Sequence, residues 1–321
     1  MPALALEQRV KARAERLYFS RAVPSRLREA DLDRRMRRVF RTSLAYPDPP
    51  VTFREKMRYK MLNDRRPLLT TFADKVAVRD YVEAKVGPEI LKELYLVTHD
   101  VTQIRRGSLP REFALKPSHG SGASMIVGEH VPRAQRLPQP PVGWARVQVS
   151  PESLDWGRLR NICREWFRLR YKPTSEWAYR NVPPSILVEE LLVEDGSVPT
   201  EFRFFVFRGG VRLITVDLGR FTGNQLVRFY APDWRPLDVR STTSYPTGPP
   251  LERPVTLAEM TRIAETLGED TDFVRVDLSD FAGRVVFGEL TSYPYGGVDE
   301  FRPASFEHEL GAWWAPPEVY R

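Results

Sequence analysis

A short apolar run that ends in a lysine and leads into a glycine-rich turn, residues 113–127, constrains the fold more than any other segment. The run before Lys116 and the run Met125–Val127 both predict strands, so the segment between them predicts the tip of a β-hairpin. Gly120 and Gly122 allow the backbone to approach an anion closely. A P-loop places its lysine after the glycines and leads into a helix, whereas here the lysine comes first and a strand follows. The segment indicates a phosphate-binding hairpin or, alternatively, an ordinary surface turn.

The composition is typical of a globular protein. The chain has 321 residues, enough for two or three domains, and contains no apolar run long enough to span a bilayer. Its first residues lack the apolar core of a signal peptide, and its single cysteine, Cys163, excludes an internal disulfide and a cysteine-based zinc cluster. We therefore expect a cytoplasmic protein.

The net charge of +7 is concentrated near the N-terminus, because residues 1–50 hold twelve Lys/Arg against six Asp/Glu. A nucleic-acid-binding core would carry its own basic stripe, so we expect no nucleic-acid partner. The arm shows apolar residues at near-helical spacing, which predicts solvated helices packed on the body. Contact with an anionic membrane surface or another polyanion is the alternative.

The region after a proline-rich linker at Tyr46–Pro50 reads as helical from Phe53 to Gly87, which places Lys75 within a helix. Further elements are predicted as a strand at 94–98, a proline-rich loop at 131–143, an amphipathic helix at 154–169 and a helix at 256–267 capped by Thr256.

The second half of the chain is rich in strands. A hairpin is expected for residues 201–218 around Gly209-Gly210, and another for 273–290 around Ala282-Gly283. Helices in one part of the chain and mostly antiparallel strands elsewhere predict an α+β protein.

Two carboxylates, Asp277 and Glu289, lie on the two arms of the last hairpin. Strand alternation allows both to lie on one face as roughly diagonal neighbours. Carboxylates on an apolar face require a cation, and Mg²⁺ bound together with substrate phosphates is a common solution. An ion pair with Arg275 or Arg284 is the alternative.

Other polar residues suggest weaker candidates. Glu189 and Glu190 are adjacent in a strand and point to opposite faces, so they predict a hinge whose backbone meets a purine edge and not a catalytic dyad. Three arginines around the central strands are candidates for binding phosphate or a substrate carboxylate: Arg203, Arg220 and Arg228. The sequence contains no nucleophile elbow, and its histidines show no metal-ligand spacing, although His119 in the glycine loop can reach a phosphate oxygen.

Taken in order, these segments resemble the TupA-like ATP-grasp family, which is associated with cell-surface polysaccharide biosynthesis. The resemblance runs from about Phe53 to Gly311. It rests on Phe53–Met57, Asp64–Pro67, Ala73–Arg79, Leu115–Gly122, Glu176–Tyr179, Val274–Leu278 and Gly288–Pro294.

The resemblance implies a nucleotide site. Lys75 and Lys116 would hold the ATP phosphates, and the loop that contains Ser118, His119, Gly120, Ser121, Gly122 and Ser124 would close over them. Glu189, Glu190, Leu191 and Leu192 would form the adenine hinge. Asp277 and Glu289 would bind Mg²⁺, with Thr291 at the position where the superfamily usually has asparagine. Lys116, Arg203, Arg220 and Arg228 would act on the reacting groups.

The resemblance also implies an α+β ATP-grasp fold with a helical arm at 1–50, an associated domain at 51–112, a lid subdomain at 113–190 and a metal-binding subdomain at 191–321. It implies an ATP-dependent carboxylate–amine ligase that acts on a small molecule or a glycan precursor through an acylphosphate. A glycosyltransferase and a non-catalytic ATP-binding module are the alternatives. Neither the acceptor nor the oligomeric state follows from the sequence.

Overall fold

The computed structural model describes residues 48–171, 176–194, 196–219, 224–242 and 245–320, together with Leu27, Ala30 and Arg34. The predicted N-terminal arm, residues 1–50, lies almost entirely outside the described residues. None of the helices in the described part of the chain has the length and apolar character needed to span a bilayer.

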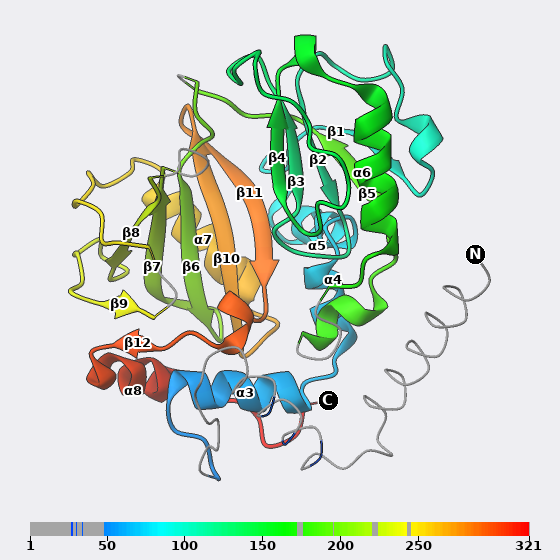
Figure 1. The fold of residues 1–321 in the computed structure, drawn as a ribbon. Helices are drawn as coiled ribbons and strands as arrows, with labels where there is room; N and C mark the ends of the chain where they lie inside the picture. The colour runs from blue at the N-terminus through cyan, green and yellow to red at the C-terminus, as the bar shows by residue number, and fades with distance from the viewer. Residues whose placement is uncertain are drawn as a thin grey trace.

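Two five-stranded sheets lie side by side (Figure 1). The smaller sheet has the order β1-β5-β2-β3-β4 and consists of β1 (Leu94–Thr98), β2 (Phe113–Pro117), β3 (Ser124–Val127), β4 (Arg146–Val149) and β5 (Ile186–Glu189). The larger sheet has the order β11-β10-β6-β7-β8 and consists of β6 (Glu201–Phe207), β7 (Gly210–Leu218), β8 (Leu226–Tyr230), β10 (Phe273–Phe281) and β11 (Arg284–Thr291). A two-stranded ribbon joins β9 (Arg240–Ser241) to β12 (Phe301–Arg302). The predicted α+β class is confirmed.

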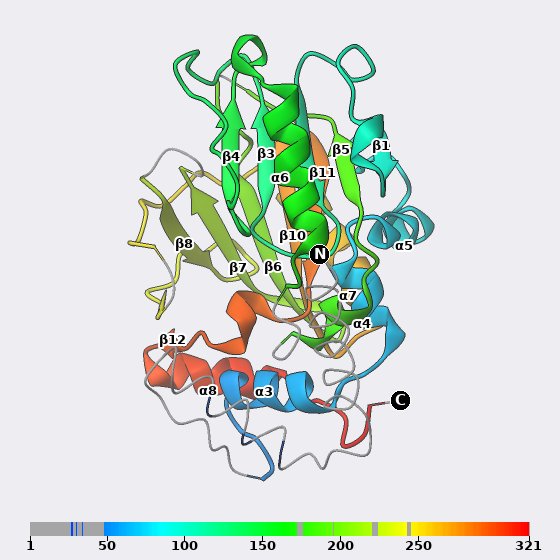
Figure 2. The ribbon, with the colours of Figure 1, turned by 45° about the vertical axis from the view of Figure 1, so that its right-hand side comes forward.

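The smaller sheet is covered on one face by α6 (Trp156–Arg168), as Figure 2 shows. Residues on β2, β3 and β5 alternate: Phe113 and Leu115 join Ile162 and Trp166 of α6 in an apolar cluster, whereas the residues between them face away from the helix. Asp155 caps the start of α6 by accepting hydrogen bonds from the backbone nitrogens of Gly157 (2.8 Å) and Arg158 (3.0 Å).

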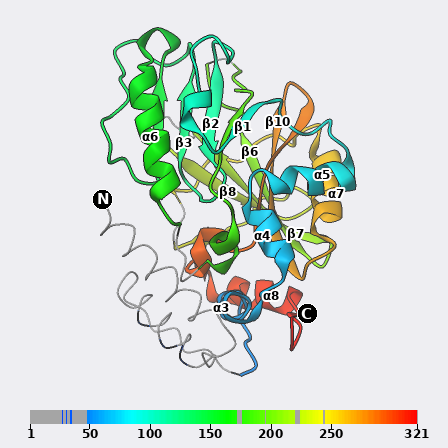
Figure 3. The same cartoon turned by 90° about the vertical axis from the view of Figure 1, so that its right-hand side faces the viewer.

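The larger sheet is covered on one face and partly covered on the other. α7 (Leu257–Gly268) packs on one face together with α5 (Ala77–Val86) (Figure 3). At one end of the other face, α3 (Phe53–Asn63) and α8 (Ala304–Trp313) enclose an aromatic cluster around Phe53, whose ring centroid lies 5.2 Å from that of Phe273. The remainder of that face is left open toward the smaller sheet.

Two local predictions were wrong. The segment 53–87 is not one helix, because it is divided into α3, α4 (Pro67–Ala73) and α5. Pro67 begins α4, and Asp74 caps its end before α5 begins at Ala77. Lys75 therefore lies in the turn between α4 and α5. Thr256 precedes α7 but makes no capping bond, since its hydroxyl donates to the Asp280 carboxylate (2.6 Å).

The short elements complete the chain: η1 (Val101–Gln103), η2 (Pro151–Ser153), η3 (Trp177–Asn181) and η4 (Pro294–Gly297). The predicted hairpins of residues 113–127, 201–218 and 273–290 are confirmed by antiparallel pairing. The predicted domain boundaries stay predictions. β1, from the segment assigned to the associated domain, pairs with β5 of the smaller sheet.

Candidate functional site

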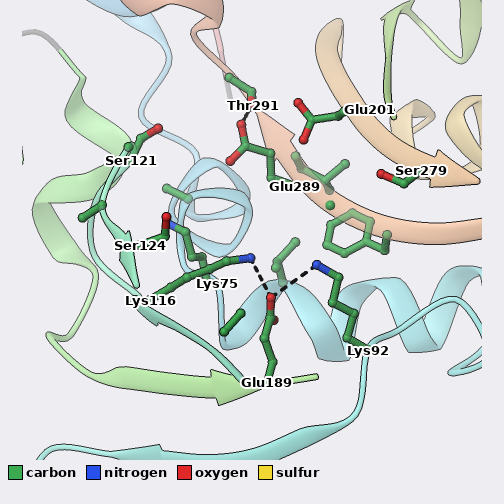
Figure 4. Close-up of a pocket in the computed structure, with 18 of the residues that line it drawn as sticks. Lys75, Lys92, Lys116, Ser121, Ser124, Glu189, Glu201, Ser279, Glu289 and Thr291 are labelled. Carbon is green, nitrogen blue, oxygen red and sulfur yellow. Dashed lines mark hydrogen bonds and ion pairs between the residues drawn. The ribbon is translucent and has the colours of Figure 1, made fainter. Parts of the chain in front are cut away.

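A cavity of about 380 Å³ separates the two sheets and takes its lining from both of them. Figure 4 shows lysines from the smaller-sheet side facing Glu289 and Thr291 from β11. Strand alternation explains the smaller-sheet contribution: Lys116, Ser124 and Glu189 occupy the positions that point away from α6.

Lys75 reaches the cavity from the turn between α4 and α5. The Asp74 side chain shapes this turn by accepting a hydrogen bond from the backbone nitrogen of Val76 (2.9 Å). The Lys75 ammonium donates to the carbonyl of Gly120, at the tip of the glycine loop. Burial, with the nearby Lys116 ammonium acting in the same direction, lowers the pKa of Lys75 to about 8. Lys75 therefore links the helical segment to the loop.

Glu189 lies between two lysines. Its Oε1 accepts from the Lys116 Nζ at 2.6 Å and from the Lys92 Nζ at 3.4 Å. Burial alone would raise the pKa of Glu189, but the two ammonium groups outweigh it and lower the pKa to about 2. Two lysine ammonium groups thus contact the Glu189 carboxylate, and Lys75 lines the same cavity, so the lysines outnumber this carboxylate.

Lys92 was missed by the sequence analysis. It precedes β1 and belongs to no motif, and only the pairing of β1 with β5 brings it to Glu189. Burial lowers its pKa, with the Lys116 charge as the next cause. The sequence contains no signal that would have found it, because this strand pairing joins segments far apart in the chain.

A β-bulge places the two predicted metal carboxylates on one face. Asp277 pairs directly with Glu289, whereas Leu278 pairs with Phe287, so the register shifts between these pairs. Without the shift Glu289 would pair with Val276 and point to the opposite face. Gly288 is the extra residue, and a Cβ at that position would lie 2.9 Å from the Asp277 carbonyl oxygen. The carboxylates are direct neighbours and not diagonal ones.

Arg275 lies against both carboxylates. Its guanidinium donates to Asp277 through Nε (2.7 Å) and Nη2 (2.6 Å), and Nη2 also lies 2.9 Å from Glu289 Oε1. The Thr291 hydroxyl donates to the same Glu289 oxygen at 2.9 Å. Burial raises the pKa of Asp277 to about 7 despite the arginine. The ion-pair alternative considered for Asp277 is therefore present in the structure.

The donor set fits Mg²⁺ in its chemistry. Two carboxylates and a hydroxyl are hard oxygen ligands, and Mg²⁺ commonly takes one or two carboxylates and completes its shell with phosphate oxygens and water. Glu289 and Thr291 line the cavity, whereas Asp277 lies behind Arg275 and is only 1% exposed. The described residues contain no group of three or more His, Cys, Asp or Glu side chains that could hold a metal by themselves. Glu289 and Thr291 are thus the donors that line the cavity, whereas Asp277 is bound by Arg275.

Most of the remaining predicted residues line the same cavity. From the glycine loop these are Ser121, Gly122 and Ser124, and from the predicted hinge they are Glu190, Leu191 and Leu192. Arg203 also lines it and pairs with Glu201 (2.9 Å) and Asp217 (2.8 Å). Their roles in binding stay predictions.

Three loop residues lie outside the cavity lining. The Ser118 hydroxyl donates to the Pro183 carbonyl (2.9 Å), which ties the loop to the start of β5. His119 points toward α6, with Nε2 3.0 Å from the Trp166 carbonyl oxygen. Gly120 packs under Trp144, whose ring would lie 2.4 Å from a Cβ at that position. These contacts hold this part of the loop in place, and none of the three residues lines the cavity, which corrects the expectation that they face the phosphates.

The three predicted arginines differ in their positions relative to the cavity. Arg203 reaches the cavity, but Arg228 does not, because it pairs with Val216 on the α7 face of the larger sheet. Arg220 lies outside the described residues.

The chain matches a known protein family over most of its length. The profile of the family described as TupA-like ATPgrasp matches residues 55–314. No curated protein matches the chain.

Among solved structures, the D-alanine-D-alanine ligase from Helicobacter pylori is 13% identical, with a TM-score of 0.42, covering 79% of this chain and 64% of that one. The ATP-grasp ligase PsnB with its minimal precursor is 12% identical, with a TM-score of 0.37 and coverages of 71% and 53%. A RiPP-associated ATP-grasp ligase from Chryseobacterium gregarium, in complex with ADP and a leader and core peptide, is 9% identical, with a TM-score of 0.39 and coverages of 84% and 68%. The chain therefore matches less than two thirds of the length of the first two proteins.

Proposed function

The chain belongs to the TupA-like ATP-grasp family, and from this premise we propose that it is an ATP- and Mg²⁺-dependent ligase that joins a carboxylate to an amine. The observation that carries the proposal is that Lys75, Lys92 and Lys116 line the same cavity as Glu289 and Thr291 of the larger sheet. An excess of lysines opposite hard oxygen donors suits a polyphosphate bound together with a divalent cation.

The lysines have distinct roles in this proposal. Lys116 and Lys92 are held by Glu189 at 2.6 and 3.4 Å, so both ammonium groups are already in position before a phosphate arrives. Lys75 contacts the glycine loop, so phosphate binding at Lys75 is coupled to the position of that loop. Lysines oriented in advance stabilise the charge that develops on a transferring phosphoryl group.

The opposite wall would hold the cation. Glu289 and Thr291 would be its first protein donors, and Asp277 would join them after Arg275 releases it. Mg²⁺ bound there would neutralise part of the negative charge of the phosphates. Arg275, once released, can bind the substrate carboxylate or the phosphoryl group bidentately.

The chemistry proposed is the usual two-step ligation. A substrate carboxylate oxygen attacks the γ-phosphorus and ADP leaves, which gives an acylphosphate. An amine then attacks the acyl carbon, and the C–N bond forms as phosphate leaves with its bonding electron pair and the amine nitrogen loses a proton to solvent. The loop Ser118–Ser124 and the segment 131–143 are the proposed lid that excludes water from the acylphosphate. We further propose that the acceptor belongs to cell-surface polysaccharide biosynthesis, as the family resemblance implies.

The test is a substrate-dependent assay of ADP release. The full chain is incubated with Mg²⁺, ATP and a panel of carboxylates and amines, and ADP and phosphate are quantified. Release that needs both substrates and is lost in Lys116→Ala and Glu289→Ala supports the ligase, while Lys85→Ala on the surface of α5 is the matched lysine control. Sugar transfer without ADP would identify a glycosyltransferase instead, and ATP binding without turnover of any pair would identify a binding module.

A further inference from the structure

Lys92 is the cavity lysine that no sequence motif explains, and it lies immediately before β1. Backbone carbonyls fix its segment: the Ile90 carbonyl accepts a hydrogen bond from the Phe287 nitrogen of β11 (2.8 Å), and the Lys92 carbonyl accepts one from Arg79 (2.7 Å). The Lys92 side chain lines the cavity and is 21% exposed. Contacts with distant segments therefore hold this ammonium group at a defined position in the site.

Lys92 and Lys116 share one carboxylate oxygen. Glu189 Oε1 lies 2.6 Å from Lys116 Nζ and 3.4 Å from Lys92 Nζ, and Figure 4 shows the two ammonium groups reaching it from different sides. The Glu189 side chain is only 9% exposed. Burial would raise its pKa, but the charges of the two lysines lower the pKa to about 2. A fully ionised carboxylate therefore lies directly beside a lysine that is proposed to bind phosphate.

This carboxylate works against an anionic ligand. Glu189 alone would offset the charge of Lys116 and would repel a phosphate bound to that ammonium, because charges a few ångströms apart interact strongly in a partly buried site. Lys92 brings a second positive charge to the same oxygen. Two ammonium groups then stand against one carboxylate, so one positive charge is left for the ligand.

We propose that Lys92 is a positioning residue that neutralises the Glu189 carboxylate and so leaves the charge of Lys116 available to the ATP phosphates. Lys92 acts through Glu189 and not by contact with the nucleotide. The inference rests on the proposed function, because it is the nucleotide that requires a positive charge at Lys116.

Two other roles for Lys92 lead to different results. A lysine that bound phosphate directly would be needed for ATP binding whether or not residue 189 carries a charge. A lysine that only supported the fold would change the stability of the protein and leave the ATP affinity of the folded chain unchanged. The charge of Glu189 is therefore the variable that separates the three roles.

The experiment is a double-mutant cycle on the affinity of the full chain for Mg²⁺-ATP, measured by titration calorimetry at pH 7. The cycle compares the unaltered chain with Lys92→Met, Glu189→Gln and the double variant. Glu189→Gln removes the charge but keeps a carbonyl oxygen for both lysines. Lys92→Arg keeps the charge at that position, and Lys85→Met is the matched lysine control, because Lys85 lies outside the cavity lining and pairs with Glu269.

We expect Lys92→Met to weaken Mg²⁺-ATP binding by about tenfold when Glu189 is present, and by less than about twofold in the Glu189→Gln background. Glu189→Gln alone should bind at least as tightly as the unaltered chain. Lys92→Arg and Lys85→Met should bind as the unaltered chain does. Chemical denaturation of each variant checks that it is folded, and Lys92→Gln replaces Lys92→Met if the latter is not.

Three results would overturn the role of Lys92. An equal loss of affinity in both backgrounds would assign Lys92 to direct phosphate binding, and no loss in either would leave it a structural role alone. Weaker binding in Glu189→Gln would show that the carboxylate does not oppose the phosphates. Each of these refutes only this inference if the unaltered chain binds Mg²⁺-ATP, whereas failure of the unaltered chain to bind it would refute the proposed ligase itself.

Discussion

Two clusters of charged side chains in this protein show how burial changes the role of the same residue types. One is a structural cluster around Asp272, at the start of β10, and the other is the lysine cluster around Glu189 in the cavity. In the structural cluster Lys60 lies 2.6 Å from Asp272 and 2.8 Å from Asp64, and its side chain is 0% exposed. In the lysine cluster the Lys116 side chain is 27% exposed and opens into the cavity.

The structural cluster is closed by further donors. Arg66 lies 3.1 Å from Asp272, and the Trp314 indole and the Tyr320 hydroxyl donate to the other carboxylate oxygen at 2.7 and 2.8 Å. Burial alone would raise the pKa of Asp272, but Lys60 and these donors lower it. Its charges are balanced within the protein, and it joins α3 to the C-terminal segment.

The lysine cluster leaves charge unbalanced. The ammonium groups of Lys92 and Lys116 contact Glu189, Lys75 lines the same cavity, and burial lowers the pKa values of Lys75 and Lys92. A closed network stabilises the fold, whereas an open cluster with excess charge of one sign is arranged for an incoming ion.

The largest effect is expected for Asp272→Ala. Removal of this carboxylate leaves two cations, Lys60 and Arg66, with Asp64 as their one remaining shared carboxylate, and breaking a buried pair costs about 3–5 kcal/mol of the free energy of unfolding. Chemical denaturation followed by tryptophan fluorescence measures the loss. A change below about 1 kcal/mol would show that the Asp272 cluster is not a structural centre and would remove the contrast.

A pH titration tests the lysine cluster. The pKa of Lys75 in the free protein is about 8, so its ammonium is charged below that pH and neutral above it. The affinity for Mg²⁺-ATP should therefore fall as pH rises above about 8, by up to about tenfold per pH unit. Equilibrium titration from pH 6.5 to 9.5 measures it. In Lys75→Arg, whose side chain stays charged, the decline should disappear; an identical decline in both proteins would exclude Lys75 as its cause.

The smallest effect is expected at an exposed pair. Lys85 lies 2.8 Å from Asp270, whose side chain is 44% exposed. Asp270→Ala should change the free energy of unfolding by about 1 kcal/mol at most, because exposed ion pairs contribute little. The same denaturation assay measures it, and a loss as large as that of Asp272→Ala would mean that burial does not explain the difference between the clusters.

Several features of the candidate site were predictable because they depend on local sequence. The Lys116 hairpin follows from two apolar runs and two glycines, and alternation along β2 and β5 orients Lys116 and Glu189 to the same side. Strand alternation also led us to expect Asp277 and Glu289 on one face of the hairpin, but alternation is only part of the reason. Their common face depends on a bulge at Gly288, which alternation alone does not reveal.

Other features required the folded chain. Lys92 joins Glu189 through a strand pairing between segments about a hundred residues apart. Arg228 was misplaced, because its orientation depends on the register of β7 with β8 and not on its own sequence. His119 lies in the predicted loop, but packing against α6 turns its ring toward Trp166.

The sequence by itself determined the hairpins, the α+β class and the family, since these depend on periodicity, turn residues and short ordered motifs. Only the tertiary structure decided which charged side chains are buried in a balanced network and which line a cavity. It placed Asp272 among donors from both ends of the chain, and it brought Lys92 and Lys116 to Glu189 with Lys75 in the same cavity. The physical reason is that the state of a charged group depends on burial and on neighbours brought together from distant segments, and neither is encoded at the residue itself.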